Sequence, residues 1–283
     1  MLKEINACDI YYSPYFNIPG SIKIPVYTTI HDIIFPDMPD LTSPFGLKLR
    51  MWFYYRAFNS SKKIFTVSEF SKSRIKFYSK KKVPVTVTYS AVQKHFFDYS
   101  GAAGRKDKKN IILFIGNIKK HKGLHILLDA FLLARSEGLP HQLVIVGSKE
   151  NFRTRDNAVI KKIESLTPGA ATFTGFISNE MLAGYLLSAA LLVQPSLYEG
   201  FGLPPLEAMT LGTQVLISDI TVFMEIYKDF PVNFFRAGDA EDLKNKMMEM
   251  LFNKPPSSPV LSNQLLLKYN FKKTAEIILG EMR

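Results

Sequence analysis

The chain has 283 residues, of which 47% are hydrophobic and 22% charged, so it is long enough for two domains with a sizeable core. Its single cysteine excludes an intrachain disulfide and predicts a reducing compartment. The longest uncharged apolar run, residues 181–196, is too short and too interrupted for a membrane span. The first residues lack the pattern of a secretory signal peptide, so we expect a cytoplasmic protein.

The formal net charge of +11 lies mainly in the first third of the chain. Residues 1–100 hold 14 Lys/Arg and 7 Asp/Glu, whereas residues 101–283 hold 22 and 18. An anionic membrane surface, a nucleic acid or an anionic substrate would each suit this basic and aromatic segment, and so would an ordinary solvated lysine surface. No helix-turn-helix, RNP or zinc-ligand spacing supports nucleic acid, so we expect no nucleic-acid partner.

The first hundred residues show alternating strand and helix patterns. Residues 99–110 are rich in Gly, Lys and Asp without hydrophobic periodicity, and they predict a linker. The expected strands are 9–12, 25–30, 64–67 and 85–88, and the expected helices are 45–58 and 69–80.

From about residue 110 the same alternation is more regular, and it predicts a parallel, doubly wound sheet. Consecutive apolar residues, as in IILFI and LVIV, suit strands that are buried on both faces. The expected strands are 110–116, 142–146, 171–174, 191–194, 214–217 and 232–235, and the expected helices are 124–135, 157–165, 179–189 and 240–252.

The stretch PSLYEGFGLPPLEAM, residues 195–209, joins an apolar strand to a helix through a turn rich in Gly and Pro. Gly200 and Gly202 allow close backbone approach and positive φ, and a proline fits the first helical turn. We expect Glu207 in that first turn and Glu199 in the loop before it. Glu207 alone could simply stabilise the helix, but the whole combination predicts a ligand site for sugar hydroxyls and phosphates.

This stretch resembles the signature of the family-4 retaining glycosyltransferases of the GT-B fold, two glutamates separated by seven residues within PS.YEGFG.P..EAM. FIGNIKKHKG, residues 114–123, resembles the glycine-turn-lysine segment that opens the family's C-terminal domain. GFISNE at 175–180 and residues 212–218 also match, and TIHDIIFP and IFTVSEFSKSRI resemble segments of bacterial mannosyltransferase-like members. The resemblance covers nearly the whole chain.

The resemblance implies an α/β fold of two Rossmann-like, doubly wound parallel-sheet domains that face each other across a cleft. The acceptor-side domain would span residues 1–100, with a C-terminal helix around 264–283 packing back on it, and the nucleotide-sugar domain would span 101–263. Residue 1 corresponds to the middle of the family's first domain. We therefore expect that domain to be incomplete and to expose a strand edge near residues 9–12.

The resemblance also assigns roles at the glutamate motif. Glu207 would bind the ribose hydroxyls of the nucleotide, and Glu199 would face the donor sugar. Lys122 would neutralise the diphosphate, because cleavage of a sugar–phosphate bond builds negative charge on the departing oxygen; considered alone, it could be an ordinary exposed lysine. The backbone amides expected to meet the sugar and diphosphate are those of Gly200, Phe201, Gly202 and Leu203.

Further donor contacts are implied by the glycine-turn-lysine and GFIS segments. Many family members carry an arginine after the glycine that corresponds to Gly116, where this chain has Asn117, which keeps hydrogen bonding but loses charge. Gly175 and Phe176 would lie against the nucleobase through their backbone groups. The same turn could also be a plain strand-to-helix connection with Ser178 as N-cap.

Two polar residues of the first hundred complete the candidate site. His31 follows an apolar strand, where polar side chains of α/β sheets point into the ligand crevice, and the family places a histidine there facing the donor sugar. A lone histidine is more often structural, and it is the resemblance that favours the ligand role here. Ser68 could line the cleft or cap the helix that begins at residue 69. No zinc-ligand, Walker or Asp-x-Asp spacing occurs, so we expect no metal and no cofactor.

We therefore expect a retaining hexosyltransferase that moves a hexose from a nucleotide-diphosphate sugar to a glycan or lipid-linked acceptor. On the resemblance alone, the donor would be GDP-mannose and the pathway cell-surface polysaccharide or lipopolysaccharide synthesis, at the inner face of the plasma membrane. The alternative is a non-catalytic remnant that only binds nucleotide-sugar.

Overall fold

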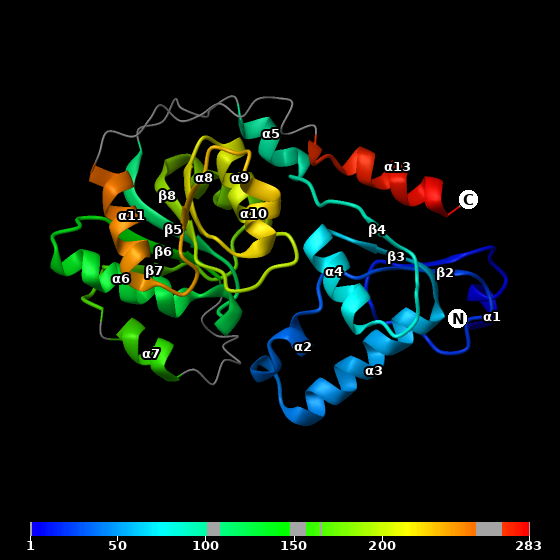
Figure 1. Ribbon diagram of the computed structural model, residues 1–283. Helices are drawn as coiled ribbons and strands as arrows, with labels where there is room; N and C mark the ends of the chain where they lie inside the picture. The colour runs from blue at the N-terminus through cyan, green and yellow to red at the C-terminus, as the bar shows by residue number, and fades with distance from the viewer. Residues whose placement is uncertain (1, 101–107, 148–156, 165, 253–267, 283) are drawn as a thin grey trace. The chain divides into compact units, whose positions relative to one another are not determined.

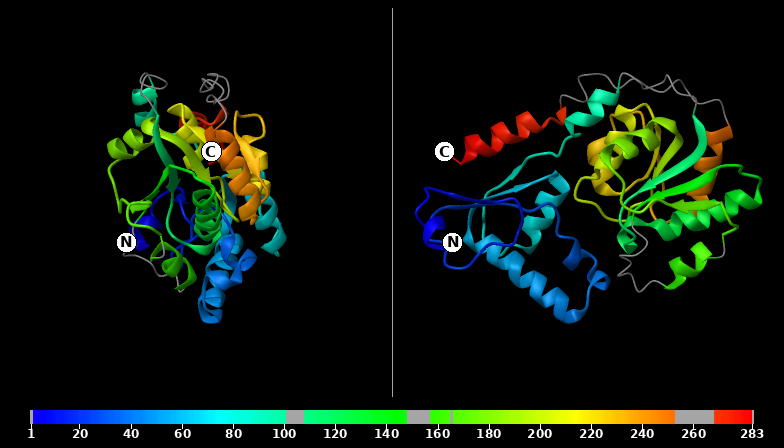
Figure 2. Two further views of the ribbon diagram at one scale, coloured as in Figure 1. Left: turned by 90° about the vertical axis from the view of Figure 1, so that its left-hand side faces the viewer. Right: turned by 180° about the vertical axis from the view of Figure 1, so that it is seen from behind.

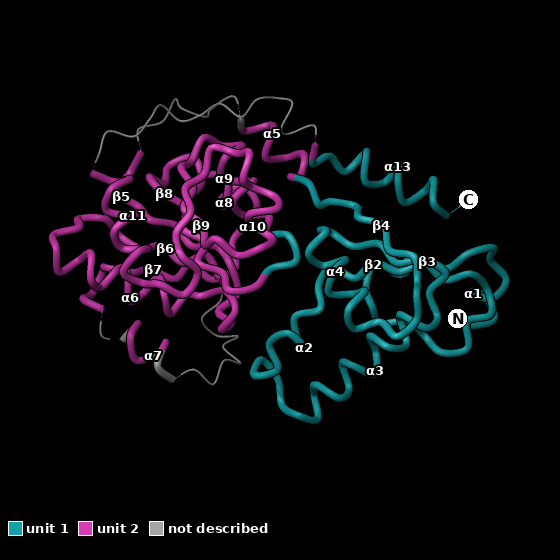
Figure 3. Tube along the Cα trace, in the orientation of Figure 1, with its two compact units in different colours: residues 1–91, 199–201, 269–283 teal, residues 92–198, 202–268 magenta. Residues whose placement is uncertain are grey.

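The computed structural model describes residues 2–100, 108–147, 157–164, 166–252 and 268–282. The chain divides into two compact units, shown in Figure 3. Unit 1 comprises residues 1–91, 199–201 and 269–283, and unit 2 comprises residues 92–198 and 202–268. Each unit is described by itself.

Unit 1 is built on a parallel four-stranded sheet with the strand order β1-β2-β3-β4 (Figure 1). Crossovers between consecutive parallel strands are right-handed, which places their helices on one face of the sheet. Tyr54 and Phe58 of α3 and Ile75 of α4 accordingly pack in one core with Val26 and Ile64 of the sheet. The elements are α1 (Leu2–Ile5), β1 (Tyr11–Ser13), β2 (Val26–Thr29), α2 (Ile34–Asp37), η1 (Pro39–Leu41), α3 (Pro44–Ser60), β3 (Ser61–Thr66), α4 (Glu69–Tyr78), β4 (Val85–Val87) and α13 (Phe271–Glu281).

The C-terminal helix α13 belongs to unit 1. The hydroxyl of Thr274 donates to the backbone oxygen of Tyr89 at 2.7 Å, and Lys63 of β3 forms an ion pair with Glu281. At the other side of the sheet, β1 pairs with β2 and leaves its second edge without a partner among the described strands, with Tyr12 exposed. The exposed strand edge expected near residues 9–12 is thus present.

Unit 2 contains a parallel six-stranded sheet with the order β10-β9-β8-β5-β6-β7. Helix α6 packs against α7 and α11, and α5 packs against α8 and α9. The green helix α6 runs beside the strands both in Figure 1 and in the rear view of Figure 2. The elements are α5 (Lys94–Ser100), β5 (Lys109–Ile115), η2 (Lys120–Lys122), α6 (Leu124–Ser136), β6 (Gln142–Val146), α7 (Asn157–Glu164), β7 (Ala171–Phe173), α8 (Asn179–Ser188), β8 (Ala189–Gln194), α9 (Leu203–Thr210), β9 (Gln214–Ser218), α10 (Thr221–Tyr227), β10 (Asn233–Phe235) and α11 (Ala240–Phe252).

The strand order of unit 2 is that of a dinucleotide-binding Rossmann sheet. The chain winds outward from β5 in one direction through β6 and β7, and then in the other direction through β8, β9 and β10. The order reverses between β5 and β8. In open α/β sheets, ligands bind at the carboxyl ends of the two strands that flank such a switch point.

Most elements agree with the sequence predictions, and the helices α1, α2 and α5 are additions to them. Strand β6 and helix α11 have the expected bounds, while α10 was not predicted, because Ile220 before it offers no capping side chain. The expected linker at 99–110 overlaps the end of α5 and the start of β5, and residues 101–107 lie outside the described residues. Residues 264–267 of the expected C-terminal helix also lie outside them. In the described ranges, no helix is long and apolar enough to cross a membrane.

Candidate functional site

The carboxyl ends of β5 and β8 carry the first group of candidate residues in unit 2. Gly116 and Asn117 follow β5, and Pro195 and Ser196 follow β8. Leu197, two residues beyond Pro195, donates its backbone N–H to the oxygen of His121 at 2.7 Å. The two loops of the switch point are therefore joined directly by a backbone hydrogen bond.

Gly123 explains why these loops can pack so closely. Its φ is +69°, and a Cβ atom at this position would overlap the backbone oxygen of Pro195. Any other residue would thus suffer both left-handed backbone strain and a collision with the main chain. Lys122 lies between this glycine and His121, so its backbone is fixed at the switch point.

The side chain of Lys122 is half-buried, and its Cδ atom lies within van der Waals reach of the space beside Gly116. The neighbouring His121 is buried, and burial, followed by the charges of Lys122 and Lys119, lowers the pKa of its imidazole to about 3. His121 is therefore neutral at physiological pH. The positive charge at this point comes from the surrounding lysines rather than from the imidazole.

Gly202 ends the loop of the glutamate motif and begins α9. Its φ of +84° is left-handed, and a Cβ atom there would overlap the ring of Phe223. Its backbone oxygen accepts a hydrogen bond from the hydroxyl of Tyr227. Gly202 thus meets both expectations for a glycine, positive φ and close approach.

Helix α9 starts with Leu203, Pro204 and Pro205. The prolines have no N–H, so the first helical turn offers amide donors only from Leu203 and Leu206. No side chain of the described residues caps this helix at Gly202. The start of this helix therefore presents few amide donors of its own, and the binding of a diphosphate by the amides of residues 200–203 stays a prediction.

Glu207 is not in the first turn of α9, contrary to the sequence prediction. The helix begins at Leu203, which makes Glu207 its fifth residue and places it in the second turn. The cause is Gly202, whose left-handed conformation lets the helix start earlier than the two prolines indicated. Glu207 is only 8% exposed, and burial raises the pKa of its carboxyl to about 7.

Three glycines follow the carboxyl ends of three adjacent parallel strands: Gly116 after β5, Gly147 after β6 and Gly175 after β7. A Cβ atom on Gly147 would overlap the backbone oxygen of Gly116, and Gly147 forms an isolated antiparallel bridge with Gly175. The carboxyl ends of these strands are therefore lined by glycine backbone with little side-chain cover. Sequence reasoning missed Gly147, because its contact with Gly116 joins residues that are far apart in the chain.

The GFIS turn has the capping geometry expected of a strand-to-helix connection. Ser178 is the N-cap of α8, and its hydroxyl accepts a hydrogen bond from the N–H of Met181 at 3.2 Å. The ring of Phe176 is 77% exposed. Gly175 has a φ of +69° with open space where a Cβ atom would be. The turn is therefore an ordinary N-capped strand-to-helix connection. Its Gly175 backbone nevertheless lies beside Gly147 without side-chain cover.

The second group of candidate residues lies in unit 1, which includes the loop of Glu199, Gly200 and Phe201. Ser68 is fully buried; its hydroxyl accepts a hydrogen bond from the N–H of Ser71 at 3.0 Å and donates to the oxygen of Gly200 at 2.7 Å. Ser68 is therefore both the N-cap of α4 and a direct partner of the motif loop. The sequence offers these two roles as alternatives, and the structure shows that one hydroxyl both caps the helix and contacts the loop.

His31 contacts the same loop through its backbone. A Cβ atom on Gly200 would overlap the oxygen of His31, which also accepts a hydrogen bond from the hydroxyl of Ser71 at 3.0 Å. The exposed imidazole of His31 has its Nε2 atom 3.2 Å from the oxygen of Pro14. Gly200 thus serves close packing and does not need positive φ, since its φ lies outside the left-handed region.

Glu199 is 8% exposed, and the ring of the nearby Phe201 is buried against Tyr269, with centroids 5.4 Å apart. Tyr89 packs on both rings. The side chain of Phe201 is therefore an anchor of the loop. Only its backbone can take the ligand role that the sequence predicted.

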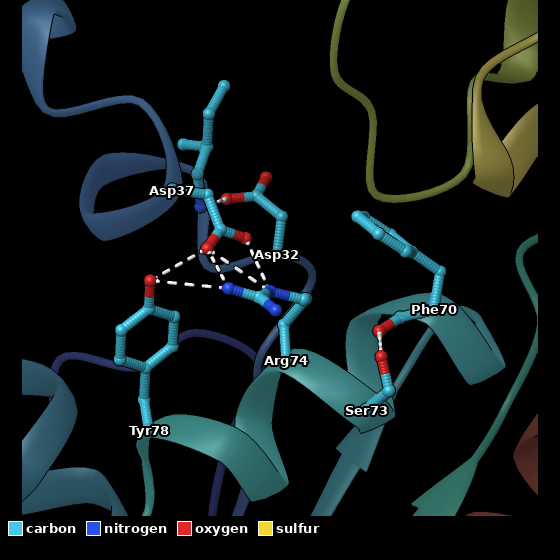
Figure 4. A network of polar contacts seen from close by, with 7 residues as sticks. Asp32, Asp37, Phe70, Ser73, Arg74 and Tyr78 are labelled. Carbon is cyan, nitrogen blue, oxygen red and sulfur yellow. Dashed lines mark hydrogen bonds and ion pairs between the residues drawn. The ribbon is translucent and has the colours of Figure 1, made fainter.

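A polar network missed by sequence reasoning joins α2 to α4 (Figure 4). The Nε atom of Arg74 donates to Asp37 at 2.8 Å, and the hydroxyl of Tyr78 donates to Asp37 at 2.7 Å. The hydrogen bond to Asp37 raises the pKa of Arg74, which stays charged. Asp32, beside His31, accepts a hydrogen bond from the N–H of Ile34 at 3.1 Å, so it caps the turn that leads to α2. These hydrogen bonds hold the segment that follows His31, from Asp32 to Asp37, against α4.

The candidate residues divide between the two units. Unit 2 holds Gly116, Asn117, Lys122, Gly175, Phe176, Gly202, Leu203 and Glu207, and unit 1 holds His31, Ser68, Glu199, Gly200 and Phe201. Across the described residues, no group of three His, Cys, Asp or Glu side chains could hold a metal ion.

Comparisons with known proteins agree on one family. The family profile described as Glycosyl transferases group 1 matches residues 97–264. The chain is 28% identical over 230 residues to O-antigen chain mannosyltransferase B of Escherichia coli, covering 78% of this chain and 59% of that protein. It is 30% identical over 202 residues to O-antigen chain mannosyltransferase RfbU of Salmonella typhimurium, covering 70% and 53%. The chain thus spans little more than half the length of these relatives.

Solved structures show the same fold. Sucrose-phosphate synthase from Thermosynechococcus elongatus superimposes with a TM-score of 0.76 at 20% identity, covering 98% of this chain and 73% of that chain. Anabaena Alr3699/HepE, solved in complex with UDP and glucose, has a TM-score of 0.77 at 18% identity, covering 99% and 79%. The predicted fold class, two Rossmann-like parallel sheets of the GT-B type, is confirmed, as is the resemblance to bacterial mannosyltransferase-like glycosyltransferases. Because the family profile matches more than half of its residues, this chain belongs to the glycosyl transferases of group 1.

Proposed function

We propose that the protein transfers a hexose from a nucleotide-diphosphate sugar to a glycan or lipid-linked acceptor, with retention of the anomeric configuration. The proposed donor is GDP-mannose, and the proposed pathway is cell-surface polysaccharide synthesis. Support for this sugar and pathway comes from relatives named as O-antigen chain mannosyltransferases.

The observation that carries the proposal is the construction of the β5/β8 switch point in unit 2. A lysine, Lys122, is fixed there by the Gly123–Pro195 packing and by the bond between Leu197 and His121. A lysine whose backbone is held at the carboxyl end of these strands suits a diphosphate. The buried Glu207 on α9 supplies a carboxyl group that can accept hydrogen bonds from ribose hydroxyls.

In the proposed reaction, the acceptor hydroxyl attacks the anomeric carbon from the face on which the diphosphate leaves. The new carbon–oxygen bond forms as the sugar–phosphate bond breaks, and the acceptor's proton passes to the departing phosphate oxygen. Lys122 stabilises the negative charge that develops on the diphosphate. Glu199 and His31 would face the sugar, and the amides of residues 200–203 would bind the sugar and diphosphate. No step requires a metal ion.

A turnover assay tests the proposal. The protein is incubated with GDP-mannose, and in parallel with other GDP- and UDP-hexoses, in the presence of membrane-derived glycolipid acceptors. We expect transfer of mannose from GDP-mannose, with the same anomeric configuration in product as in donor by proton NMR. Lys122→Met should lower kcat by about 100-fold, as expected for the loss of one transition-state charge contact.

Each other outcome has a defined meaning. Inverted configuration in the product would contradict retention. Donor binding without transfer to any acceptor would favour the alternative that the chain is a nucleotide-sugar-binding remnant. An unchanged kcat in Lys122→Met would remove the proposed role of that lysine, and Lys228→Met, which changes an exposed lysine of unit 2, serves as the matched control.

A further inference from the structure

Helix α3 of unit 1 has an apolar stripe on the face opposite its buried side. Phe45, Leu49 and Trp52 are 77%, 47% and 52% exposed. They follow the spacing i, i+4, i+7, which places them on one helical face. The buried residues of the helix, among them Tyr54 and Phe58, lie about half a turn away. An outer helical face in water is normally polar, so this stripe indicates a partner.

The segment that carries the stripe is strongly positive, although Lys63 and Arg74 of this segment form ion pairs with Glu281 and Asp37. Residues 44–82 contain eleven Lys/Arg and one Asp/Glu, so this segment accounts for ten of the eleven net positive charges of the chain. The single acid, Glu69, is already paired with Lys72 at 3.0 Å. Within α3, the guanidinium of Arg56 lies 5.3 Å from the ring centre of Trp52, at the end of the stripe.

The stripe leads to a basic loop. Lys81 donates its ammonium group to the oxygen of Asn59, near the C-terminal end of α3, at 3.0 Å. A hollow of about 540 Å³ at the end of α4 is lined by Lys76, Lys81 and Lys82 together with apolar residues that include Val83. Cationic and apolar groups therefore occur side by side, first along α3 and then in this loop.

We propose that this face of unit 1, α3 with the lysine loop of residues 80–82, binds the surface of an anionic phospholipid bilayer. Helices that lie in the membrane interface combine Trp, Phe and Leu with Lys and Arg in this way. The apolar stripe enters the boundary of the acyl chains, and the lysines contact the phosphate headgroups, each strengthening binding by about fivefold.

Other occupants fit this face less well. A second copy of the chain would bring two strongly positive surfaces together, which like-charge repulsion opposes. Nucleic acid would satisfy the lysines, but the aliphatic Leu49 in the centre of the stripe offers no stacking platform for a base. The lipid surface is the one partner that satisfies both the apolar stripe and the positive charge.

The fluorescence of Trp52 tests the proposal directly, because it is the only tryptophan of the chain. The full chain is mixed with vesicles of phosphatidylcholine, with or without phosphatidylglycerol. With the anionic vesicles we expect the emission to shift to shorter wavelength, and brominated acyl chains to quench it. An unchanged emission spectrum with anionic vesicles would overturn the proposal. No donor or acceptor is present, so this result is independent of the proposed transferase activity.

Two pairs of variants separate the apolar and the charged contributions. Phe45→Ser/Leu49→Ser, which keeps the reporter Trp52, should lower the partition coefficient at least about tenfold, whereas the control Phe252→Ser/Leu279→Ser, at exposed apolar positions on α11 and α13, should leave it unchanged. Lys80→Gln/Lys81→Gln/Lys82→Gln should lower it by about 100-fold, and the control triple Lys228→Gln/Lys272→Gln/Lys273→Gln removes the same charge from exposed positions elsewhere.

The control variants, and a parallel measurement of binding to a short DNA duplex, distinguish a lipid partner from the alternatives. Equal losses in the two lysine triples would show a general charge effect and overturn the assignment of the lysine loop. Tighter binding to a short DNA duplex than to anionic vesicles, with a steep dependence on salt, would overturn the lipid partner.

Discussion

At the scale of single residues, the candidate site depends on groups whose environment differs from that of an ordinary surface residue. Glu207 is buried and its carboxyl has a raised pKa, about 7. Gly123 and Gly202 have left-handed backbones and lie against other atoms. Ser68 makes two hydrogen bonds with one hydroxyl. Gly123, Gly202 and Ser68 shape the loops of the site, whereas the burial of the Glu207 carboxyl costs folding free energy and marks this residue as a candidate for function.

Glu207→Gln is expected to stabilise the protein at alkaline pH. The folded-state pKa of about 7 lies above the unfolded value of 4.5, so the folded state binds more protons between these two pH values. Stability therefore falls as pH rises through this window. The variant escapes this loss and should exceed wild type by up to about 3 kcal/mol at pH 8, with no difference at pH 4. Urea unfolding at both pH values measures this, and equal stability at pH 8 would contradict the raised pKa.

Gly123→Ala is expected to lower the free energy of unfolding by more than about 3 kcal/mol, because its methyl group would collide with the backbone of Pro195 in addition to the backbone strain. Gly138→Ala is the matched control, since Gly138 also has positive φ but open space around it. It should cost only about 1 kcal/mol. Urea unfolding of both variants, followed by circular dichroism, measures the two losses. Equal midpoints for Gly123→Ala and Gly138→Ala would show that the contact with Pro195 is unimportant.

At the scale of elements, the sequence predicts well those strands and helices whose apolar pattern has clear ends. QLVIV begins after a polar residue and ends at a glycine, and β6 has the predicted bounds. Helix α9 shows the limit of this reasoning, because Gly202 rather than the prolines sets its start. The prediction of Glu207 as a site residue did not depend on its turn, whereas the prediction of its place near the helix N-terminus did.

The motif loop and helix α4 are joined at Ser68, which gives an element-level prediction. Ser68→Ala removes the N-cap of α4 and a partner of the Gly200 oxygen, so it should cost about 2 kcal/mol. Ser43→Ala removes only the N-cap of α3 and should cost about 1 kcal/mol. Both serines lie in unit 1, so Trp52 fluorescence can follow both unfolding transitions. Equal losses would show that the bond to Gly200 contributes nothing.

At the scale of the whole molecule, the sequence was sufficient for the fold class, because the βαβ alternation is a local pattern. The motif string is local too, and the site residues that it names stay a prediction. It could not predict contacts between distant segments. Gly147 against Gly116, and Asp37 with Arg74, became visible only once the strands and helices were placed. The division of the site residues between two units likewise depends on the packing of residues 199–201, three residues whose neighbours in the chain belong to the other unit.

Donor binding by unit 2 is proposed to depend on Glu207 of α9. Titration calorimetry of GDP-mannose into wild type, Glu207→Gln and Glu276→Gln tests it most directly; the last is the control, at an exposed glutamate of α13. At pH 8, where the carboxyl of Glu207 is mostly ionised, we predict measurable binding to wild type and to the control, and a loss of affinity of about tenfold or more in Glu207→Gln, because one charged hydrogen-bond acceptor is removed. Equal affinity for all three proteins would show that Glu207 does not bind the donor.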